Sequence, residues 1–208
     1  MREAVKTGQW LTLDEDAAEG GRWWYDTGSP ALDFAYVGGF EHGHGSADGP
    51  EALTTPAALD AWLIERFPGL DTAATERELA DARALQVAIA RILTSVGSRD
   101  DTAAPDVDIV NLFAATPDIP PTLPGGSRQA GRSRARIGQA LSTLARDATE
   151  VLSPANRERI RACDAADCDL IFFDESRSNN RRWCSMLRCG NRAKVRAHRS
   201  RSSERPGA

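Results

Sequence analysis

The four cysteines of the 208-residue chain lie within 27 residues near its C-terminal end. Cys163 and Cys168 form one close pair and Cys184 and Cys189 form another, with four residues inside each pair and fifteen between the pairs. Zinc binds four thiolates in a tetrahedron, and two close pairs let two tight turns each supply half of the ligands. The spacing therefore predicts one structural zinc ion, with no position left for a catalytic water.

Other uses of these cysteines are weaker. Redox pairs usually have two residues between the cysteines, and a disulfide framework would spread its cysteines along the chain. Buried free cysteines would lie among apolar residues, whereas these lie among Asp, Ser and Arg. A thiol switch stays open, in which an oxidant joins Cys163 to Cys168 or Cys184 to Cys189 and releases the zinc.

The cysteines lie among basic residues. Residues 176–203 contain no acidic residue and nine basic ones: Arg177, Arg181, Arg182, Arg188, Arg192, Lys194, Arg196, Arg199 and Arg201. Without these nine, 17 of the 26 basic residues remain against 30 acidic ones, a formal charge of −13. This distribution predicts an acidic body that carries a basic contact surface.

Arginine presents a rigid fork of donors that suits phosphate oxygens and the edge of guanine. We therefore expect the nine basic residues to contact nucleic acid, with DNA favoured. Asn191 is a further candidate, because an Asn side chain can read adenine, although it could equally cap a helix. Trp183 is expected to supply the small core of the finger rather than to stack on a base. The main alternative for the arginines is docking onto the acidic body of the same chain, which would mask the surface.

Local elements must position the cysteines. LIFFD (170–174) and RRWCS (181–185) are predicted to form the arms of a hairpin around the turn SRSNN, and a helix is expected after Cys189. A knuckle, a hairpin and a ligand at a helix start together predict a treble-clef-like zinc finger. We expect this finger over residues 157–201, followed by a disordered tail over 202–208.

The rest of the chain, residues 1–152, is expected to form a separate N-terminal domain. Short strands are predicted at 22–26 and 31–37, and Pro/Gly-rich residues 117–134 are predicted to be an irregular connection. Caps, N1 prolines and apolar periodicity predict the helices; they cover 56–67, about 75–97, 106–115, about 137–148 and a short stretch after Ser153-Pro154. The predicted fold class is α+β and mainly helical.

Residues 159–201 resemble the CGNR zinc-finger family, which is named for the tetrapeptide present here as residues 189–192. The flanking features match as well: Phe172-Phe173-Asp174, Ser176-Arg177, the run from Arg181 to Met186, and Lys194. Segments 28–37, 54–63 and 141–153 resemble the ABATE domain that precedes this finger in proteins proposed to be stress-induced transcription regulators. One departure is Ala35-Tyr36-Val37, where the family commonly has Val-Asn-Thr.

The resemblance implies a zinc-dependent DNA-binding protein, a bacterial transcription regulator whose N-terminal domain senses a small-molecule or protein signal. An RNA-binding or protein-docking zinc module is the alternative, because the fold of a finger does not decide among these partners. One finger offers a small footprint, so sequence-specific binding is expected to need a homodimer or a second contact surface.

Several classes of protein are not indicated. The chain has no phosphate-binding glycine loop, nucleophile elbow or H-E-x-x-H motif, so we do not expect an enzyme. His42 and His44, near Glu41 and Asp48, could bind a metal, but a glycine-rich loop is the simpler interpretation. No apolar stretch reaches the roughly 20 residues of a membrane helix, and the N-terminus does not resemble a signal peptide. We therefore expect a cytoplasmic protein.

Overall fold

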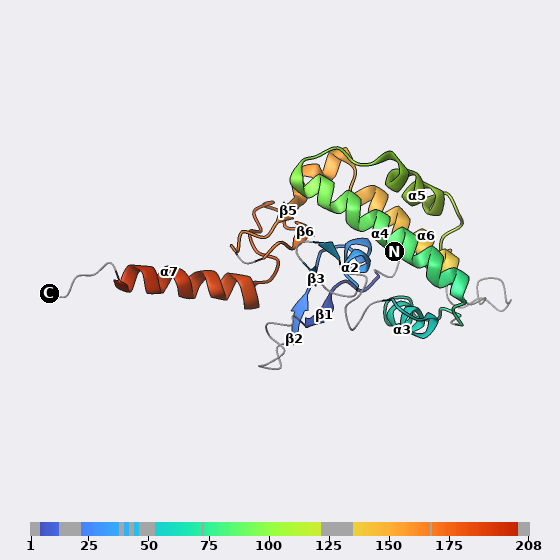
Figure 1. Ribbon diagram of the computed structural model, residues 1–208, viewed down its shortest axis with the longest axis horizontal. Coiled ribbons are helices and arrows are strands. Elements are labelled where there is room, and N and C mark those ends of the chain that lie inside the picture. The colour runs from blue at the N-terminus through green and yellow to red at the C-terminus, as the bar shows by residue number, and fades with distance from the viewer. Residues whose placement is uncertain are drawn as a thin grey trace.

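The computed structural model describes residues 5–12, 22–37, 40–41, 44–45, 53–71, 73–121, 135–166 and 168–203. Within these residues, a group of helices lies on one side of short strands, and a last helix projects away from both (Figure 1). The helices are α2 (Pro30–Ala35), α3 (Pro56–Arg66), α4 (Glu76–Ser98), α5 (Ala104–Ala114), α6 (Ile137–Val151) and α7 (Asn191–Ser203), with a 3₁₀ helix η1 (Pro154–Arg159) and a π-helical turn η2 (Met186–Gly190).

The strands of the described segments form three two-stranded antiparallel sheets. They pair β1 (Gln9–Thr12) with β2 (Arg22–Tyr25), β3 (Phe40–Glu41) with β4 (His44–Gly45), and β5 (Ile160–Ala162) with β6 (Ile171–Phe173). Helices with short strands confirm the α+β, mainly helical fold class. No helix in the described part of the chain is both long and apolar enough to cross a membrane.

The long helices form where caps and apolar periodicity predict them. Thr75 and Glu78 form a capping box at the start of α4, and Arg99 in the left-handed conformation (φ 64°) follows its end. In α6 the predicted apolar face is buried: Ile137, Leu141, Leu144 and Ala148. The periodic segments therefore become helices because one face of each enters the same core.

The prediction of a strand over residues 31–37 is wrong, because α2 occupies this segment. The Ser29 side chain accepts a hydrogen bond from the Leu32 amide at 3.2 Å, and Pro30 occupies the first turn. This is the same combination of cap and proline that correctly predicts α3 at Thr55-Pro56. The apolar composition suggested a strand, but the cap determined the structure.

The predicted hairpin of the finger is also different. Strand β6 pairs with β5, with Ile160 opposite Phe173, and residues 181–185 form no strand. The first cysteine pair therefore lies in the connection between β5 and β6. Residues 181–185 instead pass beside that connection, where the Asp164 amide donates to the Arg182 carbonyl at 2.9 Å.

One hydrophobic core joins the finger to the preceding helices. Phe172 of β6 is fully buried, and Cys184 and Cys189 belong to the same cluster of buried residues as Leu32 and Leu85. The side chain of Ile171 lies against Gly97 in α4, where an added Cβ would meet its Cδ1 atom at 2.5 Å. The finger is thus packed onto the helical part rather than attached by a linker.

Some predictions fall outside the described residues. They include most of the irregular connection (122–134), His42 and Asp48 of the candidate metal loop, and residues 204–208 of the predicted tail. Helix α7 reaches Ser203, so the first two residues of the predicted disordered tail are helical instead. The preceding helical residues provide hydrogen-bond acceptors for this last turn.

Candidate metal centre

The first cysteine pair is held by the connection between β5 and β6. The Cys163 amide donates to the Leu170 carbonyl at 2.8 Å, which continues the ladder of the two strands. The Cys168 amide donates to the Ala165 carbonyl at 3.0 Å and closes a tight turn. These two bonds bring both side chains to the end of the hairpin.

The second pair is placed by the start of a helix. The Ser185 hydroxyl accepts from the Arg188 amide at 3.4 Å, and the Gly190 amide donates to the Ser185 carbonyl at 3.0 Å. Cys184 directly precedes this cap, and Cys189 lies in the turn η2 that leads into α7. A capped helix start therefore supplies the second half of the ligand set.

All four predicted ligands come together. Their sulfur atoms all lie within 4.8 Å of one another, with Cys168 to Cys184 at 3.7 Å and Cys184 to Cys189 at 3.6 Å. A tetrahedron with Zn–S bonds of about 2.3 Å has sulfur atoms about 3.8 Å apart. The four cysteines therefore fit a tetrahedral metal ion, and the cluster is a metal-binding site.

The electrostatics of the cluster also favour a cation. Hydrogen bonds with Cys168 and then Cys184 lower the pKa of Cys163 to about 7, whereas hydrogen bonds with Cys163, Cys168 and Cys189 raise the pKa of Cys184. Four thiolates this close repel one another, so full ionisation requires a positive charge between them. Two N–H groups already point at sulfur: the Cys184 amide at Cys163 and the Arg192 guanidinium at Cys189, both at 3.5 Å.

A buried carboxylate orders the loop before Cys184. Asp174 is fully buried, and its two oxygens accept from the Ser176 amide at 2.9 Å and the Arg181 amide at 2.8 Å. The Arg161 guanidinium lies 3.8 Å from the same carboxylate. Residues 174–181 thus form a fixed loop that delivers the chain to the second cysteine pair.

Arg181 has a structural position that the sequence pattern did not indicate. Its guanidinium lies 4.2 Å from the centroid of the Phe172 ring and donates to the carbonyl groups of Trp183 (3.0 Å), Asp26 (2.9 Å) and Cys184. It therefore joins the N-terminal segment to the metal centre. Arg181 therefore does not belong to the candidate contact surface, because its donors are directed to the protein's own carbonyls.

Two tyrosines of the N-terminal part hold strand β6. The Tyr25 hydroxyl donates to the Ile171 carbonyl at 2.7 Å, and the Tyr36 hydroxyl accepts from the Ile171 amide at 3.0 Å. The Phe173 amide adds a bond to the Thr27 carbonyl at 2.8 Å. Tyr36 belongs to the Ala35-Tyr36-Val37 stretch, and its hydroxyl group binds the finger strand.

The other predicted nucleic-acid residues differ in exposure. Asn191 is exposed, and five basic side chains are exposed as well: Arg177, Arg182, Lys194, Arg196 and Arg199. Arg188 and Arg192 are half-buried, and Arg201 lies in α7 with its side chain outside the described atoms. Arg182 also pairs with Asp164 at 2.7 Å and lies 4.9 Å from the centroid of Trp183. Trp183 itself is half-buried against the core, as predicted.

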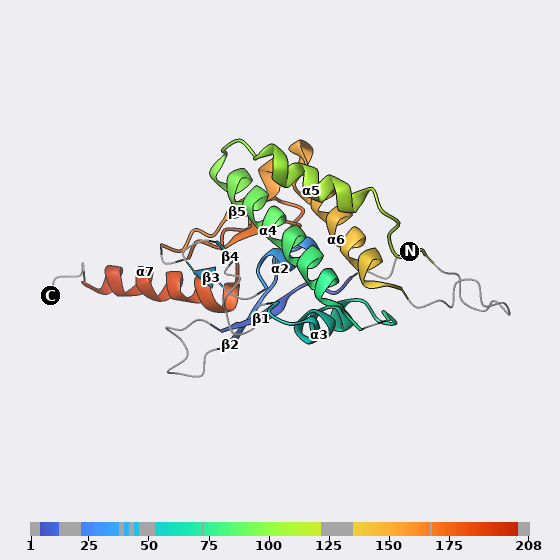
Figure 2. The same cartoon turned by 45° about the vertical axis from the view of Figure 1, so that its right-hand side comes forward.

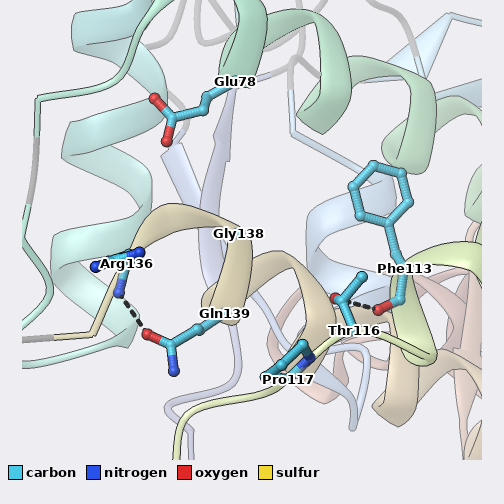
Figure 3. Close-up of a pocket in the computed structure, with 7 residues that line it drawn as sticks. All are labelled: Glu78, Phe113, Thr116, Pro117, Arg136, Gly138 and Gln139. Carbon is cyan, nitrogen blue, oxygen red and sulfur yellow. Dashed lines mark hydrogen bonds between the residues drawn. The ribbon is translucent and has the colours of Figure 1, made fainter.

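A pocket separate from the cysteine cluster lies among α4, α5 and α6 (Figure 3). Its volume is about 620 Å³, and it is lined by Glu78, Phe113, Thr116, Pro117, Arg136, Gly138 and Gln139. Two of the polar side chains here cap helices: Glu78 accepts from the Thr75 amide at 2.9 Å, and Gln139 accepts from the Arg136 amide at 3.0 Å. Donors and acceptors used in this way explain the helix starts and do not indicate a ligand.

Comparisons with known proteins agree with the resemblance in the sequence. A family model of the CGNR zinc finger matches residues 159–202, and the ABATE model, described as "Putative stress-induced transcription regulator", matches residues 28–154. A search of the curated proteins returned no match. Both models match in the expected order, and the second covers more than half of the chain.

Proposed function

Since this chain belongs to the ABATE family and ends in a CGNR zinc finger, we propose that it is a zinc-dependent DNA-binding transcription regulator. The observation that carries the proposal is the join between the metal centre and a projecting basic helix. Cys189 lies in η2, and α7 begins two residues later at Asn191. A metal ion bound by the four sulfurs would therefore fix the start of that helix.

Zinc is the proposed metal because of the donor set. Four thiolates in a closed tetrahedron are typical of structural zinc, so the ion would stabilise the fold rather than catalyse a reaction. Cys163, Cys168, Cys184 and Cys189 would hold it, and the Arg192 contact with the Cys189 sulfur would stabilise one thiolate. One ion satisfies all four sulfurs.

The proposed contact surface consists of α7 and the loop before the second cysteine pair. Its five exposed basic residues, Arg177, Arg182, Lys194, Arg196 and Arg199, can neutralise phosphates. Helix α7 extends away from α3–α6 in both Figure 1 and Figure 2. This arrangement supports an external polyanion as the partner, in preference to the acidic body of the same chain.

The test is the salt dependence of binding to duplex DNA by the full-length zinc-loaded protein. Five phosphate contacts predict a slope of about −4.5 for log K against log salt concentration. Replacing both Arg196 and Arg199 by Gln should reduce the slope by about 1.8. Arg83→Gln, at an exposed position of α4, is the matched control and should leave the slope unchanged.

Other outcomes would redirect the proposal. Absence of duplex binding by the zinc-loaded protein at low salt would refute it. Binding to structured RNA or single strands that exceeds duplex binding would favour the RNA-binding alternative. Tight DNA binding that survives complete removal of zinc would contradict the proposed dependence on the metal.

A further inference from the structure

The helical segment from Met186 through α7 carries apolar side chains that the protein's own core does not cover. Leu187 is 82% exposed and Val195 is 49% exposed. Single exposed apolar residues are common on protein surfaces. These two, however, lie within a segment of nine basic and no acidic residues, so their surroundings suit a polyanion that itself presents apolar groups.

Leu187, Asn191 and Val195 lie along one side of this helical segment. The Asn191 side-chain amide donates to the Leu187 carbonyl at 3.0 Å, which aligns the two residues. Val195 follows Asn191 by four residues and is therefore turned only about 40° from it. We name these three residues the reading face; it extends about 12 Å along the axis, the length of three to four base-pair steps.

Basic residues flank the reading face on both sides. At about 100° per residue, Arg199 and Arg196 lie about 40° and 100° from Val195 in one direction, and Lys194 lies about 100° in the other. All three side chains are exposed. Helix α7 as a whole projects away from α3–α6 in the two views of Figures 1 and 2.

We infer that the reading face contacts A·T base pairs in the major groove of DNA, with phosphates held by the basic residues on either side. This inference rests on the proposed function. The major groove admits an α-helix and exposes the thymine methyl group together with the N7 and N6 atoms of adenine. Leu187 and Val195 would cover thymine methyl groups.

Asn191 would bind adenine in a bidentate way. Its Nδ2 atom carries two hydrogens, of which one already binds the Leu187 carbonyl at 3.0 Å. The second hydrogen can donate to adenine N7 while Oδ1 accepts from N6, and the bond to Leu187 would hold the amide plane during both contacts. The Asn191 side chain would thus make one hydrogen bond within the protein, to Leu187, and two hydrogen bonds to adenine.

Modified duplexes test the inference directly on the full-length zinc-loaded protein. We compare an alternating A·T duplex of about 20 base pairs with the same duplex carrying uracil in place of thymine, which lacks only the methyl groups. One methyl group buried on binding corresponds to about a fourfold change in affinity. The wild-type protein should bind the uracil duplex at least about fourfold more weakly.

Variants assign the effect to residues. Leu187→Ala should weaken binding to the thymine duplex by about fourfold and should respond less to uracil, with an unchanged salt slope because no phosphate contact is lost. The wild-type protein should bind more weakly to a duplex in which 7-deazaadenine, which lacks N7, replaces adenine. The Asn191→Ala variant should bind the two duplexes equally. Leu112→Ala, at a residue of α5 that is 68% exposed, is the control and should behave as wild type.

The results separate this inference from the proposed function. Salt-dependent binding with equal affinity for thymine and uracil duplexes would overturn the inference and leave the function standing. Binding to no duplex would remove the function. A Leu187→Ala variant that holds zinc normally and keeps full sensitivity to uracil would also contradict the reading face, and would point to a protein partner for Leu187.

Discussion

Arg181 and Asp33 show how single polar side chains support this fold. Arg181 directs its donors to carbonyl groups on both sides of the contact between the finger and the N-terminal part. Asp33 is fully buried in α2 and accepts from the Thr27 hydroxyl at 2.7 Å and the Thr27 amide at 3.2 Å, as well as from the Gly8 amide. Each side chain satisfies groups that are distant in the sequence.

The Arg181 contacts predict a loss of stability on substitution. In Arg181→Lys the shorter, non-planar amine cannot reach three carbonyls together, so the free energy of unfolding should fall by about 2–3 kcal/mol. Urea denaturation of the zinc-loaded protein measures this value. Arg177→Lys, at an exposed position of the same loop, should change it by less than about 0.5 kcal/mol. Equal stability of the two variants would contradict the structural role.

Asp33 predicts a pH dependence. Burial raises the pKa of its carboxyl from 3.8 to about 6, although the Thr27 and Gly8 hydrogen bonds oppose the shift. The folded chain then binds the proton more tightly than the unfolded chain, so this group lowers the free energy of unfolding as the pH rises from about 4 to 6, by up to about 3 kcal/mol.

Asp33→Asn removes this titration. The difference in unfolding free energy between wild type and Asp33→Asn should therefore change with pH between 4 and 6 and be constant above 7. Urea denaturation at a series of pH values measures it, and the effect of pH on the metal centre cancels in the difference. Parallel stability curves across this range would disprove the prediction.

At the scale of elements, the contact between α2 and β6 depends on a glycine. Gly28 has φ +78°, and an added Cβ would lie 2.6 Å from the Phe173 carbonyl oxygen. Gly138 in the first turn of α6 has a helical backbone and open space around its Cα atom. Replacing each glycine by alanine therefore compares a crowded, left-handed position with an open, helical one.

Gly28→Ala should lower the free energy of unfolding by at least about 2 kcal/mol, because a left-handed residue gains a side chain against a backbone carbonyl that cannot move away. Gly138→Ala should raise it by about 0.5–1 kcal/mol through helix propensity. Thermal and urea denaturation report both changes. Similar effects at the two positions would mean that the α2–β6 contact is looser than the structure shows.

At the scale of the whole molecule, the finger and the helical part share one core. Phe172 and Cys184 are buried in the same cluster as Leu85 and Leu141, from α4 and α6. Tyr25 and Tyr36 add hydrogen bonds across the same contact. Metal binding at one end of this core is therefore expected to stabilise the helices at the other.

Removal of the metal should lower the melting temperature of the helices, not only that of the finger. Far-UV circular dichroism reports mostly on helices such as α4 and α6, and its midpoint should fall by about 10 °C or more after chelation, since several kcal/mol are lost at about 2–4 °C per kcal/mol. Cys184→Ser should melt at the lower temperature with or without chelator. An unchanged helical midpoint in the metal-free protein would show two independent domains.

Local patterns predicted much of this molecule. The spacing of the four cysteines predicted the cluster because two short turns must each deliver two sulfurs, a requirement that is visible in the chain itself. Helix α3 followed from its Thr55-Pro56 cap, and helices α4 and α6 followed from apolar periods, which are also visible in the chain itself. The strand predicted over 31–37 failed where two local signals disagreed, and the Ser29-Pro30 cap determined the outcome.

The sequence by itself determined the metal ligands, the long helices and the excess of basic residues near the C-terminal end. Only the tertiary structure decided that β6 pairs with β5, that Arg181 turns inward, and that finger and helices share a core. These features depend on hydrogen bonds and burial between residues far apart in the chain. A count of charges treats Arg181 and Arg199 alike. Only the fold places backbone carbonyls around the Arg181 guanidinium and leaves Arg199 exposed.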